Sequence, residues 1–319
     1  MKKLYEFIPY YVLEKYRTNF ISKHSSFEYL EKCNGIIYGK EGLSAEQYNK
    51  EIVRKLEEGV PFMSGRMGAT ELSVAKTFDF EIHQNYAKVL NQFKQWSGFF
   101  PEEKEAAIQY VELMKKAVSC SDYLGIWYMP FEDYYIKKYA QKSVSLTHLD
   151  YLEPWLCPEQ PWSVALEGKK VLVIHPFSET IKYQYARREK LFPGTDILPK
   201  FHLETLRAVQ TVGKEVDRRF ENWFQALAWM YEETLKIEFD IAIIGCGAYG
   251  LPLAAMLKNA GKMVIHLAGA TQILFGIKGT RWEQETYSYV RSFYNEYWIK
   301  PLPIDTPDSA ASVEDNSYW

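Results

Sequence analysis

Cysteine is scarce in this chain, and the few cysteines stand too far apart to build a site together. The 319 residues include 4 cysteines, with no C-x-x-C pair and no histidine beside them at the spacing of zinc ligands. We therefore expect neither structural zinc nor a disulfide framework. The four are Cys33, Cys120, Cys157 and Cys246.

Long apolar runs and an excess of positive charge are also missing. No run of about 18 apolar residues occurs, and the N-terminus lacks the apolar core and cleavage site of a signal peptide. The formal net charge of -3 provides no overall positive field for a nucleic-acid backbone. With 47% apolar and 25% charged residues, the composition is typical of a globular protein. We expect a cytoplasmic chain that does not bind nucleic acid.

Strand-like and helix-like segments alternate along the chain. Helices are indicated by apolar periodicity and by end signals, such as Ser44 before and Gly59 after the first clear one. This alternation predicts an α/β fold, a Rossmann-like and mostly parallel sheet with helices on both faces. The expected strands are 61–66, 122–129, 169–177, 240–245 and 262–269, and the clearest helices are 44–59, 101–121 and about 249–259.

We expect three parts: an N-terminal arm over 1–45, a single α/β domain over 46–299 and a tail over 300–319. The arm interleaves aromatic with basic residues, which suits either packing on the domain or docking as an interfacial helix on a membrane. Packing is favoured because Pro9 interrupts a long helix. The tail is acidic and proline-rich, so we expect it to be loosely ordered.

One motif resembles a dinucleotide fingerprint but lacks its main partner. Gly245, Gly247 and Gly250 have the spacing G-x-G-x-x-G between a strand and a helix. The acidic residue that binds the ribose, about 20 positions further on, is missing, because the second strand ends in His266 and Leu267. Too little chain follows for the rest of a dinucleotide-binding sheet. We expect no NAD.

The glycines can have two other roles. They can let backbone N–H groups, with Tyr249 in the same turn, approach a nucleotide diphosphate at a helix N-terminus. Alternatively, they let the helix pack tightly on the strand.

The stretch SGRMGATELSVA brings charged residues to another strand-to-helix connection. Arg66 can clamp a phosphate, and Glu71 can hold a metal, a ribose hydroxyl or an acceptor hydroxyl. Gly68 lies between them on the same connection. The alternative is a structural ion pair between Arg66 and Glu71.

The hexapeptide from Arg66 to Glu71, RMGATE, resembles the R-x-G-D-G-E signature of glycosyltransferases with the GT-D fold, a Rossmann-like architecture associated with bacterial surface polysaccharides. Later strand–glycine–helix blocks agree in order, and the likeness covers about 61–282. The resemblance implies transfer of a sugar from a nucleotide-sugar donor, a UDP-sugar, to a surface-polysaccharide or lipid-linked glycan acceptor. Such an acceptor implies peripheral contact with the inner face of the membrane.

The centre of the signature differs from the family pattern. In the family the D-x-E part is thought to engage the diphosphate and a divalent metal, whereas Ala69 stands here at the aspartate and Thr70 at the glycine. Glu71 remains as the metal ligand, which puts dependence on Mn²⁺ or Mg²⁺ in doubt. Transfer without metal would need other compensation of the diphosphate charge. The candidates are Arg66, Lys182, Arg187, Arg188 and the turn from Gly245 to Gly250.

Other polar residues follow strands at the same expected edge. His175 is a candidate base or donor contact, with a hydrogen-bonded turn residue as the alternative, and we rank it behind Glu71 as the base. Arg281 and Trp282 could form a cation–π pair in the core or a lid over the sugar. Candidate sugar or acceptor contacts are Ser178, Thr180, Thr271 and Gln272.

The sequence thus predicts a glycosyltransferase of the hexosyltransferase type. Two alternatives stay open, an NAD(P)-dependent oxidoreductase and a non-catalytic nucleotide-binding scaffold of envelope biosynthesis. Ala69 favours the scaffold, because a lost metal ligand is what a retired enzyme would show.

Overall fold

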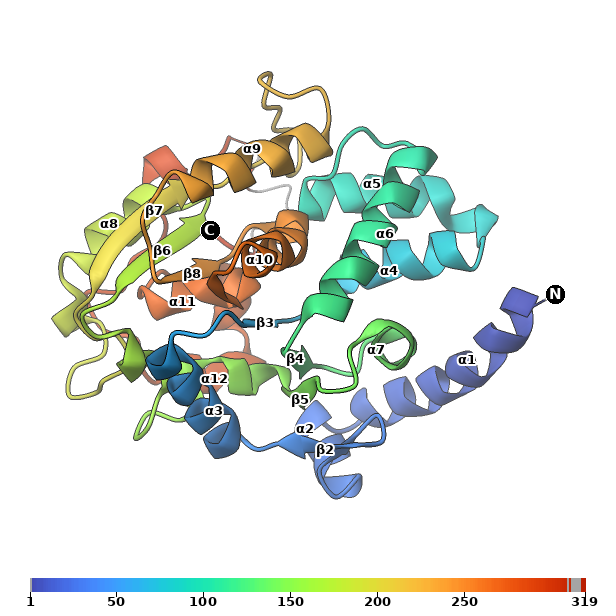
Figure 1. Ribbon diagram of the computed structural model, residues 1–319, viewed down its shortest axis with the longest axis horizontal. Helices are drawn as coiled ribbons and strands as arrows, with labels where there is room; N and C mark the ends of the chain where they lie inside the picture. The colour runs from blue at the N-terminus through green and yellow to red at the C-terminus, as the bar shows by residue number, and fades with distance from the viewer. Residues whose placement is uncertain (1, 309, 311–316) are drawn as a thin grey trace.

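A nine-stranded sheet forms the centre of the molecule in the computed structural model, which describes residues 2–308, 310 and 317–319. The strand order is β1-β2-β5-β4-β3-β9-β8-β6-β7 (Figure 1). Every neighbouring pair is parallel except β1 with β2. The strands are β1 Ile36–Ile37, β2 Lys40–Leu43, β3 Met63–Gly65, β4 Tyr123–Ile126, β5 Ser145–His148, β6 Lys170–His175, β7 His202–Arg207, β8 Ile241–Ile244 and β9 Met263–His266.

Helices cover both faces of this sheet, as the sequence predicts. Along β6, Val171 and Val173 belong to one apolar cluster while Leu172 and Ile174 belong to another, because successive side chains of a strand point to opposite faces. Helices α4, α5, α6, α9 and α10 contribute to the second cluster, and α3, α8 and α11 to the first. The helices are α1 Lys2–Ile21, α2 Ser26–Lys32, α3 Ala45–Glu58, α4 Ala69–Asp79, α5 Tyr86–Ser97, α6 Lys104–Cys120, α7 Glu132–Tyr139, α8 Ser178–Tyr185, α9 Trp223–Leu235, α10 Gly250–Asn259, α11 Thr271–Leu274 and α12 Ser288–Arg291, joined by several short 3-10 turns.

Local end signals explain why α3 forms where the sequence predicts a helix. Ser44 and Gln47 make a reciprocal capping box at its start, which satisfies two backbone N–H groups. Gly59 ends the helix with φ 65°, a left-handed conformation that glycine adopts without strain.

The N-terminal region differs from the expected arm in two ways. Strand β2 pairs in parallel with β5, so residues before position 45 belong to the main sheet. Helix α1 also continues through Pro9, although proline removes one backbone hydrogen bond. The later turns of the helix contact α4 and α7 through Glu14 and Arg17.

Contacts with α4 and α7 hold α1 on the body of the molecule. The Arg17 guanidinium forms a buried ion pair of 2.7 Å with Asp133 of α7. Lys76 of α4 reaches the Glu14 carboxylate at 3.3 Å. The Tyr10 ring meets Tyr134 edge-on at 5.2 Å between ring centres. The side of α1 that carries positions 10, 14 and 17 therefore faces the domain.

A buried carboxyl group beside this anchor makes stability depend on pH. Glu132 accepts hydrogen bonds from the Tyr38 hydroxyl at 2.8 Å and from the Tyr128 backbone N–H at 2.9 Å. Its other oxygen, Oε1, has no partner within the described residues. Burial raises the pKa of Glu132 from 4.5 to about 7.

We expect Glu132→Gln to become progressively more stable than the wild type as pH rises from about 4.5 to about 7. In this range the unfolded wild-type carboxyl is ionised while the folded one stays protonated, so its contribution to the free energy of unfolding falls as pH rises, by about 3 kcal/mol in total. Glutamine keeps the shape without titrating. Urea unfolding of both proteins across this range measures the difference, and parallel curves would contradict the assignment.

Candidate functional site

A pocket of about 260 Å³ lies at the edge of the sheet where the parallel strands end. Its walls include residues that directly follow β3, β6, β8 and β9, which are neighbours in the sheet. The chain runs from β3 outward to β4 and β5 and then crosses to the other side for β6, so the strand order reverses here. Open α/β sheets typically bind ligands at such a point. Of the residues singled out in the sequence, Arg66, Gly68, Glu71, His175, Gly245, Gly247, Tyr249 and Arg281 line this pocket.

Arg66 follows β3, and its positively charged side chain lines the pocket. Its guanidinium lies 4.5 Å from the centre of the Trp127 ring, a cation–π contact. Buried Nε has no hydrogen-bond partner among the described residues, and no ion pair of Arg66 within 4.0 Å occurs among them. The structural ion pair with Glu71 is therefore not formed. A buried N–H without a partner favours an acceptor group on a ligand.

Two carboxyl groups, the buried Glu153 and the partly buried Asp150, lie close enough to Arg66 for its charge to lower their pKa values. Burial raises the pKa of Asp150 to about 6, and the Arg66 charge opposes this rise. Burial, together with the nearby Asp150 charge, raises the pKa of Glu153 well above its ordinary value. The protonated form of Glu153 is therefore favoured, whereas Asp150 is mostly ionised at pH 7 and offsets part of the Arg66 charge.

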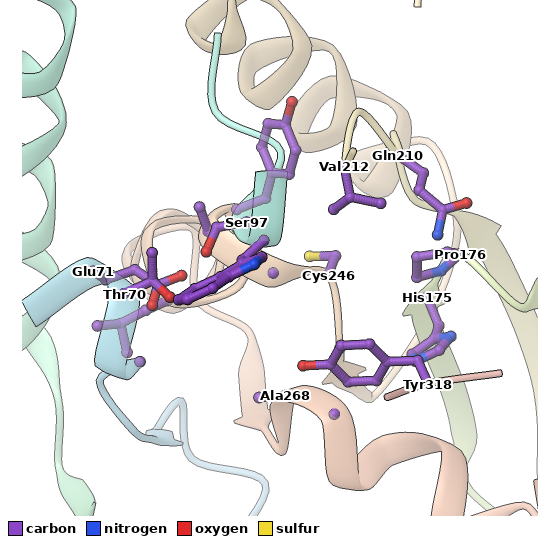
Figure 2. A pocket seen from close by; sticks show the side chains of 18 of the residues that line it. Thr70, Glu71, Ser97, His175, Pro176, Gln210, Val212, Cys246, Ala268 and Tyr318 are labelled. Atoms are coloured by element: carbon purple, nitrogen blue, oxygen red, sulfur yellow. The ribbon is translucent and has the colours of Figure 1, made fainter. Parts of the chain in front are cut away.

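Glu71 lies in the first turn of α4, with its carboxylate folded back over the start of the helix. A side chain at Gly68 would collide with that carboxylate, so the glycine is needed for this placement. Negative charge in the first turn is favoured by the helix dipole. Burial and the Glu71 charge both raise the pKa of Tyr110, which also lines the pocket. Figure 2 shows Glu71 and Thr70 on the side of the pocket opposite His175.

The glycine turn after β8 is required by packing, whatever it binds. A Cβ at Gly245 would lie 2.5 Å from the Ala268 carbonyl and 2.7 Å from the His175 ring. Gly247 has φ +56°, and a side chain at Gly250 would collide with His266. The packing interpretation of these glycines therefore holds. The turn still lines the pocket at Gly245 and Gly247, whereas Gly250, the buried first residue of α10, does not line it.

Tyr249 within this turn belongs mainly to the core. Its ring stacks on Trp223 with 4.7 Å between centres and 8° between planes. Only 1% of the residue is exposed. The stacked and buried ring supports the turn from behind, so the Tyr249 side chain belongs to the core and not, as predicted, to the diphosphate site.

His175 is held as a neutral donor, a correction to its expected role as a base. The Phe177 backbone N–H donates to His175 Nδ1 at 3.0 Å, so the neutral ring carries its proton on Nε2. Burial lowers the pKa of His175 to about 3. A ring of this kind can donate a hydrogen bond to a ligand oxygen but is a poor acceptor for a proton. Glu71 is left as the candidate base.

The four expected sugar contacts lie behind the pocket wall. Ser178 and Thr180 are buried on α8, where both the backbone N–H and the hydroxyl of Thr180 donate to Asp305. The Thr271 hydroxyl donates to a carbonyl of β8 at 3.3 Å. The Gln272 side-chain amide donates to three backbone carbonyls. Because none of the four lines the pocket, the structure assigns them to packing.

The other basic candidates for the diphosphate also lie outside the pocket. Lys182 pairs with Glu179 at 2.9 Å, and Arg188 pairs with Glu189 at 2.8 Å. The Arg187 guanidinium is occupied by the Gln184 side chain and by a backbone carbonyl. Of the basic candidates for the diphosphate, Arg66 lines the pocket, and Arg281, expected in the core or in a lid over the sugar, lines it as well.

Sequence reasoning missed His266, at the end of β9. This pocket-lining residue is 4% exposed, and neither ring nitrogen has a hydrogen-bond partner within the described part of the chain. Burial, followed by the nearby Arg66 charge, lowers the pKa of His266 to about 3. His266 occupies the strand end where a dinucleotide-binding fold has its acidic residue. This position is the one feature of the sequence that could have identified His266 as a site residue.

The end of the tail was also missed, and it packs rather than lying loose. Trp319 is buried, and Tyr318 points into the pocket in Figure 2. The Arg281 guanidinium lies 4.7 Å from the Tyr318 ring centre, closer than its 6.0 Å from Trp282. Residues 309 and 311–316, which the expected loose tail includes, fall outside the described residues. The polar, proline-rich composition of the tail gave no sign that Tyr318 and Trp319 line the pocket.

The donor set at the signature does not fit a divalent metal. Ala69 lines the pocket at the position of the family aspartate and offers no ligand, which leaves Glu71 as the one carboxylate of the signature. Within the described residues there is no group of three or more metal-ligating side chains. Mg²⁺ and Mn²⁺ prefer several oxygen ligands, so we derive no step through a metal.

Comparison of the chain with protein-family models, with curated proteins and with solved structures finds no match.

Proposed function

We propose that this chain is a glycosyltransferase with a GT-D-like arrangement, which moves a sugar from a UDP-sugar to a surface-polysaccharide or lipid-linked glycan acceptor in the cytoplasm. The observation that carries the proposal is the meeting of Arg66, Glu71 and the glycine turn after β8 in one pocket. The resemblance of the RMGATE segment points to the signature for donor binding, and the backbone geometry of a glycine turn at a helix start suits a diphosphate. The signature with Arg66 and Glu71 lies about 175 residues before the glycine turn in the sequence, so the fold brings them together.

Arg66 and the backbone of the glycine turn before α10 would hold the diphosphate. The guanidinium supplies positive charge and an N–H that has no partner among the described residues. The N-terminal end of α10 adds a partial positive charge. Uncharged His175 would donate from Nε2 to a donor oxygen. Together these groups can stabilise the negative charge that develops on the departing diphosphate.

Glu71 would act as the general base. Its carboxylate accepts the proton of the acceptor hydroxyl while that oxygen bonds to the anomeric carbon of the sugar. The bond from the anomeric carbon to the diphosphate oxygen breaks, and UDP leaves with the electron pair. The reaction involves no change of oxidation state, and the departing UDP carries the electron pair of the broken bond.

Release of UDP from a panel of UDP-hexoses, in the presence of a lipid-linked glycan extract, tests the proposal. We expect release that depends on both the donor and the extract and that persists in EDTA. Absence of release with every donor, combined with binding of NAD or NADPH, would favour the oxidoreductase. Binding of UDP without any turnover would favour the scaffold.

A further inference from the structure

Helix α1 turns an apolar stripe toward solvent. Ile8, Val12 and Tyr16 follow one another at intervals of four residues and are 49%, 60% and 55% exposed. Tyr11, between them on the same side, is exposed as well. Side chains spaced by three or four residues line one face of a helix. We call these four residues the α1 stripe.

The opposite side of α1 already has its partners, so the α1 stripe is not a core face waiting to be buried. Tyr10, Glu14 and Arg17 make the contacts with α4 and α7 described above. In Figure 1 the helix runs along the outside of the domain, with its N-terminal end directed away from it. An exposed apolar face on a helix that is fixed by its other face marks an interaction surface.

Lysines border the α1 stripe and give the surface its charge. Lys15 Nζ lies 4.8 Å from the Tyr11 ring centre, and Lys32 of α2 lies 5.5 Å from that of Tyr16 while donating to its hydroxyl at 3.0 Å. Both lysines, and Lys23 between the helices, are exposed. Glu14 is engaged by Lys76. On α2, Glu31 stands beside Lys32, and Glu28, one turn earlier, lies 3.0 Å from the His24 ring.

We propose that the α1 stripe docks on the surface of an anionic lipid bilayer. Apolar and tyrosine side chains would enter the headgroup region, where rings with one polar end are favoured, while the lysines meet lipid phosphates. None of the described helices is long and apolar enough to cross a bilayer, so the contact is peripheral. This inference does not depend on the proposed transfer reaction.

Co-sedimentation with vesicles tests the docking. We expect the full chain to bind vesicles of phosphatidylcholine with about one third phosphatidylglycerol, and to bind pure phosphatidylcholine about tenfold more weakly. Val12→Glu should reduce binding to the anionic vesicles about tenfold, since it puts a charge in the centre of the α1 stripe. Lys15→Glu should reduce it as well and should weaken its dependence on salt.

Val216→Glu is the matched control, because Val216 is 72% exposed on a loop far from α1 in sequence and the change in charge is the same. It should bind like the wild type. Equal binding to both kinds of vesicle, no binding by the wild type, or no effect of Val12→Glu would overturn the proposal. A dimer in solution that Val12→Glu dissociates would overturn it in favour of a contact between two copies of the chain.

Discussion

Replacing Glu71 with glutamine should lower the rate of UDP release about a hundredfold to ten-thousandfold, the range typical for loss of a general base. Glutamine keeps the size of the side chain and its place over Gly68 but cannot accept the proton of an acceptor hydroxyl. Binding of UDP should change little, because Arg66 and the glycine turn before α10 hold the diphosphate. Steady-state kinetics with a UDP-hexose, and calorimetry with UDP, separate the two effects.

Two controls make the Glu71 result specific. Thermal unfolding of Glu71→Gln should lie within a few degrees of the wild type, since the substitution loses a helix-dipole interaction of about 0.3–1 kcal/mol and no buried volume. Glu46→Gln makes the same change in the first turn of α3, where Glu46 pairs with Lys50 on the surface, and should keep full activity. A Glu71→Gln protein with wild-type turnover would remove Glu71 from the chemistry.

Replacing Arg66 with alanine should weaken UDP binding about tenfold to a hundredfold. A hydrogen bond to a charged group contributes about 1.5–3 kcal/mol, and the Arg66 guanidinium has no ion pair within the described residues to divert it. Arg66→Lys should recover part of the loss, because lysine keeps the charge but not the paired N–H groups. Isothermal titration calorimetry with UDP gives the affinities.

Lys182→Ala is the matched control for Arg66, since the sequence proposed both residues for the diphosphate and the structure places Lys182 on the surface with Glu179. It should bind UDP like the wild type. Equal weakening by Lys182→Ala and Arg66→Ala would indicate a general effect of charge and would contradict a direct contact of Arg66.

The central strands and their helices could be predicted because local and global signals agree there. Strands β6, β8 and β9 are short apolar runs buried on both faces, as parallel strands are. Two errors lie where that agreement is lost. Strand β7 has the sequence HLETLR, a polar edge strand without an apolar run. The helical spacing of Val216 and Phe220 with the apolar residues of α9 predicts a longer helix, but α9 begins at Trp223 behind the Asn222 cap and both residues lie in the preceding loop.

The candidate site could be predicted where residues directly follow strands, and less well elsewhere. Arg66, Glu71, Gly245 and His175 come together because the ends of parallel strands share one edge. Thr180 follows a strand too, but only the structure shows that its backbone N–H and its hydroxyl both donate to the Asp305 carboxylate and so do not face a ligand. Tyr318 reaches the pocket through long-range packing, which leaves no pattern in the sequence near it.

Thermal unfolding of the wild type with UDP, UDP-hexoses, NAD and NADPH, each with Mn²⁺ or with EDTA, tests the account most directly. A ligand that binds only the folded state at a hundred times its Kd adds about 2.7 kcal/mol to the free energy of unfolding. We predict that UDP compounds raise the melting temperature, that they do so in EDTA as well as in Mn²⁺, and that Arg66→Ala reduces the shift. A rise with NAD or NADPH alone, or no rise with any UDP compound, would contradict the assignment of this pocket to a nucleotide-sugar donor.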